Sequence, residues 1–202
     1  IVDTSQVREK LRCKVLKSPE IKLNISREVS PESRRVLSLE VCDDKSSEWK
    51  GLRENHLTAG VASRTLKKNI FGSGGYGSIG QLLRWYNDSE YREKEQKKLE
   101  ENPYCRHGLF YQAEGAALYS LVTGFTVTPL GFIKGPVEGD GFADVPDYLA
   151  ATCDYLCVQE PIIVEIKCPA KIHKNWRERY WVQCQHQMQI ARVKTLHLVM
   201  YI

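Results

Sequence analysis

The chain has 202 residues, of which 42% are hydrophobic and 27% are charged, and its formal net charge is +4 at pH 7. This length is sufficient for one domain with a buried core. The sequence contains no apolar run long enough to cross a membrane as a helix. These values exclude a disordered chain and a helical membrane protein, and they indicate a soluble globular protein.

The seven cysteines are scattered along the chain, and no two are spaced as Cys-x-x-Cys. We expect reduced thiols in a cytoplasmic or nuclear compartment rather than a disulfide framework. An iron–sulfur site on Cys153, Cys157 and Cys168 is disfavoured, because their spacing is unlike that of ferredoxins. The start at Ile1, without methionine or a signal-peptide pattern, and the abrupt end after residue 202 predict a fragment of a longer chain.

In chain order, the sequence predicts helices, then a series of strands, and then one more helix and strand. Residues 1–40 are expected to form an N-terminal helical appendage, with a helix start at Ser30-Pro31. Residues 41–202 are expected to form the main domain. The glycine-rich run 71–78 lacks the GxxxxGK[ST] pattern and is expected to be a surface loop.

The order of elements in the main domain predicts an α/β fold with a mixed central β-sheet flanked by helices. The expected helices are Trp49–Leu66 with a turn at its end, Gln81–Glu100, Gly108–Val122 closed by Gly124, and His173–Ala191. The expected strands are Phe125–Thr128, Gly131–Lys134, Leu149–Cys153, Ile162–Lys167 and Leu196–Ile202.

The most informative stretch joins Asp154 to the strand Ile162–Lys167 through the pattern Asp-x10-Glu-x-Lys. Because side chains alternate along a strand, Glu165 and Lys167 project from one face, and the apolar residues beside them project from the other. Asp154 comes from a preceding turn or strand and can meet Glu165. Two carboxylates and a backbone carbonyl suit a hard cation such as Mg²⁺, and a lysine can stabilise a phosphate or orient a water. The pattern therefore indicates metal-dependent phosphodiester hydrolysis.

Ordinary alternatives exist for each of these features. A Glu-x-Lys pair also occurs on the wet face of amphipathic strands, and Asp147 is a second candidate acid, although it lies farther from Glu165. The segment Lys171–Lys194 holds six Lys or Arg and one acid, which suits a phosphodiester substrate. A solvated helix face would have the same composition.

Four blocks of sequence carry further motifs in a fixed order. They are Trp49–Arg53 with Leu57–Ala59; Gly108, Gln112 and Tyr119 with Thr123-Gly124; Ala151–Leu156 with Val164–Pro169; and Tyr180–Gln185. This order resembles the phage λ exonuclease and YqaJ-like viral recombinase family of PD-(D/E)xK nucleases. The Glu-x-Lys-Cys-Pro block and the Tyr-x-x-Gln-x-Gln helix are the specific parts, and residues 1–40 lie outside the resemblance.

The resemblance implies a restriction-endonuclease-like core and an Mg²⁺-dependent nuclease, with Mn²⁺ as a substitute and one or two ions bound. It implies that Asp154, Glu165 and the backbone carbonyl of Ile166 ligate the metal. Lys167 would then act on the attacking water or the scissile phosphate, and Gln183 would face the site.

Other residues follow from the same resemblance. Arg53 resembles an arginine that grips a 5′ phosphate, with Thr58 and Ser63 as further phosphate contacts; a surface helix position is the alternative for Arg53. On the last helix, the spacing places Gln183 and Gln187 on one stripe with Trp176 and Tyr180. This stripe either faces the site, where it would hold the water and stack on a base, or it places the two aromatic residues in the core and the glutamines at its rim. The stripe of Trp181, Cys184 and Met188 is expected to pack on the sheet.

The sequence also departs from the family pattern. Gln112 stands where the family has a glutamate near the metals, and an amide brings no charge. Glu114 is a substitute from another helical face. Cys153 and Tyr155 replace the proline and glycine that flank the aspartate, and Gly60 replaces a serine.

Three functions are compatible with these observations. The first is a 5′–3′ exonuclease on duplex DNA ends that serves recombination or viral DNA processing, with ring trimers in the family as the oligomer to expect. The second is a nucleic-acid-binding module that kept the fold while its site decayed, which Gln112 favours. The third is a scaffold domain of a larger eukaryotic or viral protein.

Overall fold

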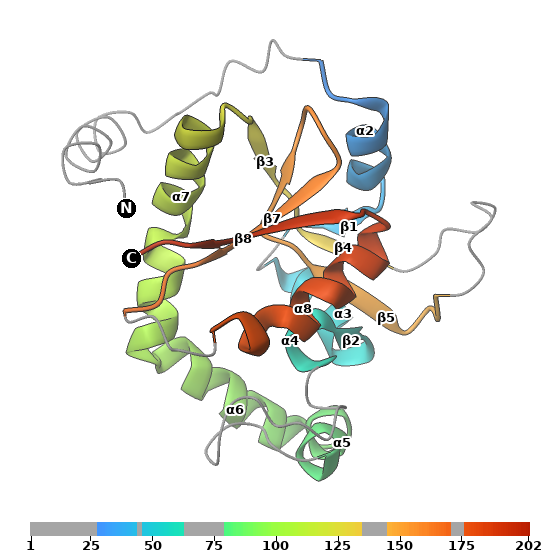
Figure 1. Ribbon diagram of the computed structural model, residues 1–202. Coiled ribbons are helices and arrows are strands. Elements are labelled where there is room, and N and C mark those ends of the chain that lie inside the picture. Colours follow the sequence, from blue (N-terminus) through green and yellow to red (C-terminus); the bar gives the residue numbers. More distant parts are fainter. Residues whose placement is uncertain (1–27, 44–45, 63–78, 135–144, 171–175) are drawn as a thin grey trace.

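The computed structural model describes residues 28–43, 46–62, 79–134, 145–170 and 176–202 (Figure 1). The helices are α2 (Pro31–Leu37), α3 (Ser47–Asn55), α4 (Ala59–Ala62), α5 (Ile79–Asn87), α6 (Ser89–Glu101), α7 (Pro103–Thr123) and α8 (Trp176–Ala191). The strands are β1 (Glu40–Cys42), β2 (Leu57–Thr58), β3 (Val127–Pro129), β4 (Phe132–Lys134), β5 (Leu149–Thr152), β6 (Tyr155–Cys157), β7 (Ile162–Lys167) and β8 (Thr195–Met200).

Capping side chains set the helix boundaries. Ser30 caps α2 by accepting a hydrogen bond from the backbone N–H of Ser33, and Gly124 ends α7 in the left-handed conformation with φ 75°. The single helix predicted over 81–100 is wrong, because Asp88 leaves the helical conformation and caps a new helix by accepting from the Tyr91 N–H. The helix before Asp88 is amphipathic and the helix after it is strongly polar, and Asp88 lies where this character changes.

The strands form two mixed four-stranded sheets in the orders β1-β4-β5-β2 and β3-β6-β7-β8. Two chain segments run antiparallel to each other through both sheets. The segment β3–β4 pairs with the segment β5–β6, through β4 and β5 in the first sheet and through β3 and β6 in the second. At the crossing, the Leu130 N–H donates to Asp154 O at 3.1 Å, and the Cys153 N–H donates to Gly131 O at 3.2 Å. The mixed α/β class is confirmed, but the predicted central sheet is divided at Asp154.

Strand β7 is the centre of the second sheet and is covered on both faces (Figure 1). Ile162, Val164 and Ile166 pack into a cluster with Ala116 and Tyr119 of α7. Ile163 packs on the opposite face, with Ile190 and Ala191 of α8. The alternation predicted from the sequence is confirmed, and the face that carries Glu165 is buried as well.

Helix α2 packs into the same core as the sheets. Val36 is fully buried in the cluster of Ile163 and Ile190, and the hydroxyl of Ser33 donates to Cys157 O at 2.9 Å. The division between an appendage over 1–40 and a domain over 41–202 stays a prediction, because residues 1–27 lie outside the described ranges. The predicted loop 71–78 lies outside them too.

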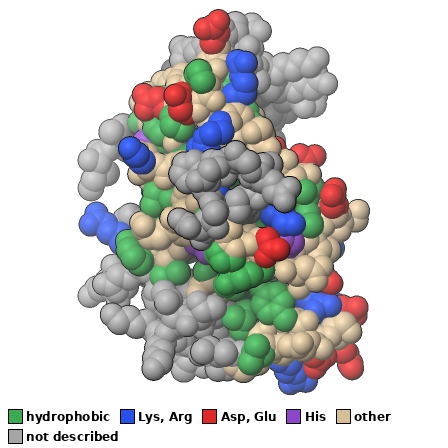
Figure 2. Space-filling view, turned by 90° about the vertical axis from the view of Figure 1, so that its right-hand side faces the viewer, with side chains coloured by type: hydrophobic (Ala, Val, Ile, Leu, Met, Phe, Trp, Pro, Cys, Tyr) green, Lys and Arg blue, Asp and Glu red, His purple; other side chains and the backbone are tan. Residues whose placement is uncertain are grey.

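The surface is mixed in character. On the face drawn in Figure 2, acidic and basic side chains of the described residues are interspersed. Helix α7 exposes large apolar side chains near both ends: Tyr104, Leu109, Phe110, Leu121 and Val122. Across the described parts of the chain, no helix has the length and apolar content needed to cross a membrane.

A glycine sets how closely α7 approaches the sheet. A Cβ built at Gly115 would lie 2.9 Å from Cγ2 of Ile166 and 3.2 Å from Cβ of Tyr201. Tyr119 lies one turn farther along α7, and its hydroxyl is 2.6 Å from Nδ1 of His197 on β8. These contacts show that α7 runs antiparallel to β7 and β8, so residues before Gly115 lie beside the Lys167 end of β7.

Gly115→Val is expected to destabilise the fold by about 1–3 kcal/mol, because the added methyl groups overpack the contact with Ile166. Gly108→Ala is the matched control, since a Cβ at Gly108 meets no atom within 4 Å and alanine favours the helix by about 0.5–1 kcal/mol. Guanidinium unfolding measures both variants. A Gly115→Val protein as stable as the parent would contradict the close packing of α7.

Candidate active site

Asp154 lies where the two sheets divide, directly before β6. Its Oδ2 accepts a hydrogen bond from the backbone N–H of Ile166 at 2.7 Å. Strand β6 pairs with β7 only up to Val164, so the Asp154 side chain takes the place of the next strand residue at this edge of β7. The carboxylate is thereby fixed beside the segment that carries Glu165 and Lys167.

Glu165 is 2% exposed, yet it carries a carboxylate that accepts three hydrogen bonds. Lys167 Nζ donates to Oε1 at 2.5 Å, and Gln183 Nε2 donates to the same oxygen at 2.6 Å. Gln187 Nε2 donates to Oε2 at 2.7 Å. A buried charge needs such partners, because removal from water is otherwise costly.

Lys167 combines an ion pair with an aromatic contact. Its ammonium lies 5.2 Å from the centre of the Tyr180 ring, in addition to its contact with Glu165. Burial alone lowers the pKa of Lys167, but Glu165 and Asp154 outweigh burial and raise the pKa above its usual range. The lysine is therefore a fixed positive charge at neutral pH.

The backbone of β7 directs one carbonyl toward Asp154. Lys167 O accepts from the Tyr201 N–H on the β8 side at 2.9 Å, and strand residues alternate the side to which their backbone groups point. The N–H of Ile166 points toward Asp154, so its carbonyl points to the same edge. Asp154, Glu165 and Ile166 thus offer oxygen donors of the kind that Mg²⁺ and Mn²⁺ prefer.

The donor set fits a divalent cation, but it is small. Among the described residues, no group of three or more His, Cys, Asp or Glu is arranged to hold a metal ion. One of these donors, Oε1 of Glu165, already accepts a hydrogen bond from the positively charged ammonium of Lys167. The two carboxylates and the carbonyl are the oxygen donors that this edge of β7 offers.

Helix α7 places Gln112 and Glu114 near the end of β7. Gln112 is half-buried one turn before Gly115, on the stretch that runs beside the Lys167 end of the strand. Glu114 accepts a hydrogen bond from the hydroxyl of Tyr201. The carboxylate of Glu114 therefore has a structural partner, and Gln112 brings no charge to the site.

Three buried thiols surround the acids without adding charge. Burial and then Glu165 raise the pKa of Cys153 well above its usual value. Burial, followed by Asp154 for Cys168 and by Glu165 for Cys184, raises each of these pKa values to about 11. All six cysteines in the described residues are free. These thiols stay protonated at neutral pH and add no charge to the site.

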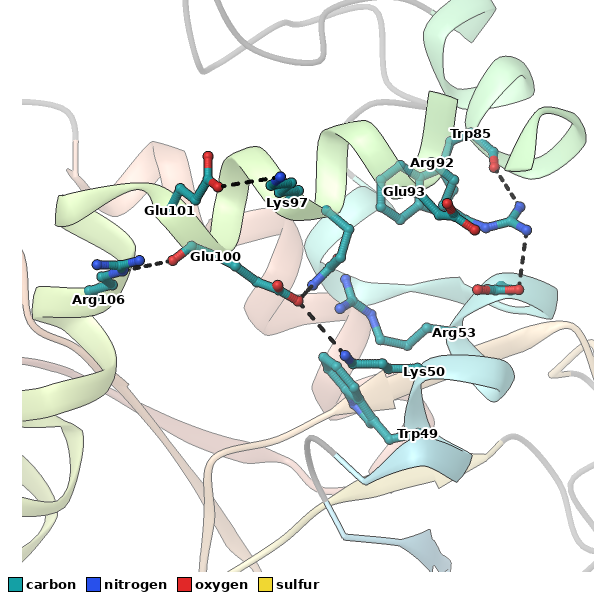
Figure 3. Close-up of a pocket in the computed structure, with 12 residues that line it drawn as sticks. Trp49, Lys50, Arg53, Trp85, Arg92, Glu93, Lys97, Glu100, Glu101 and Arg106 are labelled. Carbon is teal, nitrogen blue, oxygen red and sulfur yellow. Dashed lines mark hydrogen bonds and ion pairs between the residues drawn. The ribbon is translucent and has the colours of Figure 1, made fainter. Parts of the chain in front are cut away.

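Arg53 lies on α3 at a cavity of about 500 Å³ between α3 and the helices α5 and α6 (Figure 3). Its guanidinium stacks on Trp49, 4.4 Å from the ring centre. Trp49 Nε1 in turn donates to Oγ1 of Thr152 at 2.9 Å, two residues before Asp154. The cavity is therefore joined to the strand that leads to the acids.

The charges around this cavity are largely balanced by ion pairs. Lys50 Nζ lies 3.8 Å from Glu100, and Arg92 lies 3.2 Å from Glu54 (Figure 3). Both pairs connect α3 with α6. The cavity is thus a polar recess with an aromatic wall rather than a strongly basic patch.

The remaining predicted residues are placed as follows. Thr58 is 5% exposed in β2, which pairs with β5, and Ser63 lies outside the described residues. Asp147 is exposed in the turn before β5. His107 lies in α7, and its ring centre is 4.7 Å from that of Tyr111.

Helix α8 differs from the expected stripe. Trp181 was expected to pack on the sheet with Cys184 and Met188, but it is 60% exposed. The inward face is centred on Gln187, which is fully buried, and Trp181 lies about 120° around the helix from it. The spacing of four residues predicted that Gln183 and Gln187 share a face, but only Gln183 was singled out for a role at the site.

No family model matches the chain, and no curated protein matches it. Its fold does match solved structures. An alkaline exonuclease from Laribacter hongkongensis, LHK-Exo, superposes with a TM-score of 0.54 and 21% identity, over 77% of this chain and 74% of that chain. LHK-Exo in complex with dAMP superposes with a TM-score of 0.51 and 20% identity, over 78% and 74% of the two chains. The restriction-endonuclease-like fold expected from the motifs is confirmed.

Lys167→Met is expected to lower the free energy of unfolding by about 3–5 kcal/mol, because it leaves the buried Glu165 without its positive partner. Lys98→Met is the control, since it removes an exposed ion pair with Glu95 and is expected to cost about 0–1 kcal/mol. Urea unfolding at pH 7 with a chelator measures both. Equal small losses would show that Glu165 does not depend on Lys167.

Proposed function

We propose that this chain, which has the fold of an alkaline exonuclease, is a metal-dependent deoxyribonuclease that hydrolyses phosphodiester bonds. One observation carries the proposal: Asp154 accepts a hydrogen bond from the backbone N–H of Ile166, next in the strand to Glu165, whose buried carboxylate is bound to Lys167. A buried carboxylate held by a lysine and two amides has no evident role in stability, because an apolar residue of similar size would pack there at lower cost. Such an arrangement is characteristic of functional sites.

Each residue has a distinct proposed role. Asp154 and Glu165 hold Mg²⁺, or Mn²⁺ in its place, together with the carbonyl of Ile166, and one or two ions are accommodated. Bound metal supplies a more acidic water and neutralises charge on the phosphate. Lys167, fixed as a cation by its surroundings, contacts the scissile phosphate or orients the attacking water. Gln183 holds Glu165 from the exposed side.

The proposed substrate is DNA, most specifically duplex ends degraded in the 5′–3′ direction. The complex of LHK-Exo with dAMP supports a nucleotide as the ligand of this fold. Arg53 is the proposed grip on a terminal 5′ phosphate, since a guanidinium pairs with phosphate through two hydrogen bonds. Its place at the cavity, one side chain away from Thr152, supports this role.

A second candidate function is a nucleic-acid-binding module with a weakened site. Gln112 favours it, because the amide adds no charge where one lysine already offsets one of the two carboxylates. In that case the protein would bind DNA ends but degrade them slowly or not at all. Digestion assays with linear and closed circular DNA, with and without Mg²⁺, distinguish the two functions.

Further proposals concern the setting of the protein. The free thiols support an intracellular location, cytoplasmic or nuclear, and the resemblance to phage and viral enzymes supports a role in recombination or DNA processing. A homo-oligomer, with a ring trimer as the form to test, is proposed on the same resemblance.

Asp154→Asn is expected to abolish cleavage and to weaken Mn²⁺ binding by more than about 100-fold. The amide oxygen still accepts from the Ile166 N–H, so the fold is kept while the charge is lost. Asp147→Asn is the control, since Asp147 is exposed in the preceding turn. Calorimetry with Mn²⁺ and digestion of linear DNA measure both. Unchanged Mn²⁺ affinity in Asp154→Asn would refute the metal assignment.

Arg53→Ala is expected to slow digestion of 5′-phosphorylated duplex about 10-fold or more, because each lost charge-assisted hydrogen bond is worth roughly 1.5–3 kcal/mol. Digestion of 5′-hydroxyl duplex should change little. Lys97→Ala is the control, since Lys97 lines the same cavity but is exposed and pairs with Glu101. Equal losses on both substrates, or nicking of closed circles by the parent, would exclude recognition of the terminal phosphate.

A further inference from the structure

Gln187 is the one fully buried amide on α8, and both of its donor contacts reach the strands of the site. Its Nε2 donates to the carbonyl of Thr152 on β5 at 2.9 Å and to Oε2 of Glu165 on β7 at 2.7 Å. Both partners are acceptors only, so the amide can have just one orientation. Gln187 is thus held with its nitrogen toward the acids.

The oxygen of the same amide has no such contact. Within the described parts of the chain, Oε1 of Gln187 is the only buried side-chain oxygen or nitrogen without a hydrogen-bond partner. An unpaired buried acceptor is costly, and a native structure keeps one only where something else is gained. An apolar side chain would fill the same space without leaving an acceptor unpaired. What the glutamine adds is the two hydrogen bonds that its Nε2 donates, to Thr152 and to Glu165.

The contacts of Gln187 divide the two oxygens of Glu165 between an inner and an outer side. Oε2 is taken by the fully buried Gln187, whereas Oε1 faces Lys167 and Gln183, which are both partly exposed. The carboxylate is therefore held in one rotation, with its Oε1 on the side of the partly exposed Lys167 and Gln183.

Gln187 also joins the two strands that bring the acids together. Thr152 lies two residues before Asp154, and Glu165 lies on the adjacent sheet. One side chain therefore spans the division between the sheets and fixes the segment before Asp154 relative to Glu165. Its loss would free both the rotation of Glu165 and the spacing of the two carboxylates.

We propose that Gln187 is a positioning residue, which holds Glu165 so that Oε1 is presented to the divalent cation and keeps Asp154 and Glu165 at a binding distance. The proposal rests on the metal-dependent function given above. Gln187 acts only through Glu165 and Thr152 and does not touch the metal or the substrate. Gln183, by contrast, contacts the other oxygen of Glu165, Oε1.

The test compares Mn²⁺ affinity, measured by calorimetry on folded protein, with the free energy of unfolding in the presence of a chelator. Gln187→Met keeps the length of the side chain and removes its donors, and Gln187→Asn keeps an amide that is one methylene too short. Gln189→Met is the matched control, because Gln189 is exposed two residues along the same helix. Circular dichroism at low temperature establishes that each variant is folded.

The expected result is an Mn²⁺ dissociation constant that rises about 10- to 100-fold in both Gln187 variants and stays within about twofold in Gln189→Met. Near-parent affinity in a folded Gln187→Met protein would overturn the proposal, whatever its stability. Failure of both variants to fold would also overturn it, since Gln187 would then be a structural requirement. If the parent bound no Mn²⁺ and degraded no DNA, the proposed function itself would fail.

Discussion

A carboxylate in the middle of a buried strand is the constraint on which the site depends. Glu165 is 2% exposed on β7, which is covered by α7 and α8. The charge must be matched by donors from its own surroundings, because water cannot reach it freely. Lys167 supplies the opposite charge from the same strand, and α8 supplies two amides. The polar centre of α8's inward face follows from this need.

The division of the sheet gives the second acid its place. The strand pair that crosses between the sheets changes partners at Asp154, and the carboxylate fills the open edge of β7 by accepting from Ile166. A continuous sheet would have satisfied that N–H with a backbone carbonyl and left no carboxylate there. A set of contacts also runs from the cavity to the site, through Trp49, Thr152 and Gln187. The cavity and the two acids therefore belong to one packed unit.

The site is less negative than its acids suggest. Lys167 is held as a cation, and the thiols of Cys153, Cys168 and Cys184 stay protonated because burial raises their pKa values. Gln112 adds a dipole rather than a charge. Under the proposed function, binding of a divalent cation would depend on the placement of two carboxylates rather than on a high local charge. This makes the hydrogen bonds that orient Glu165 more important here than in a site with additional acids.

The sequence by itself determined the local features. The alternation in Ile162–Lys167 predicted the strand and the shared face of Glu165 and Lys167, and Gly124 predicted the end of α7, because these depend on neighbours in the chain. The tertiary structure decided what depends on distant partners. The sheet is divided at Asp154, Trp181 is exposed, and Gln187 donates a hydrogen bond to Glu165. Periodicity shows that residues share a face, but only packing decides which face is buried and what it meets.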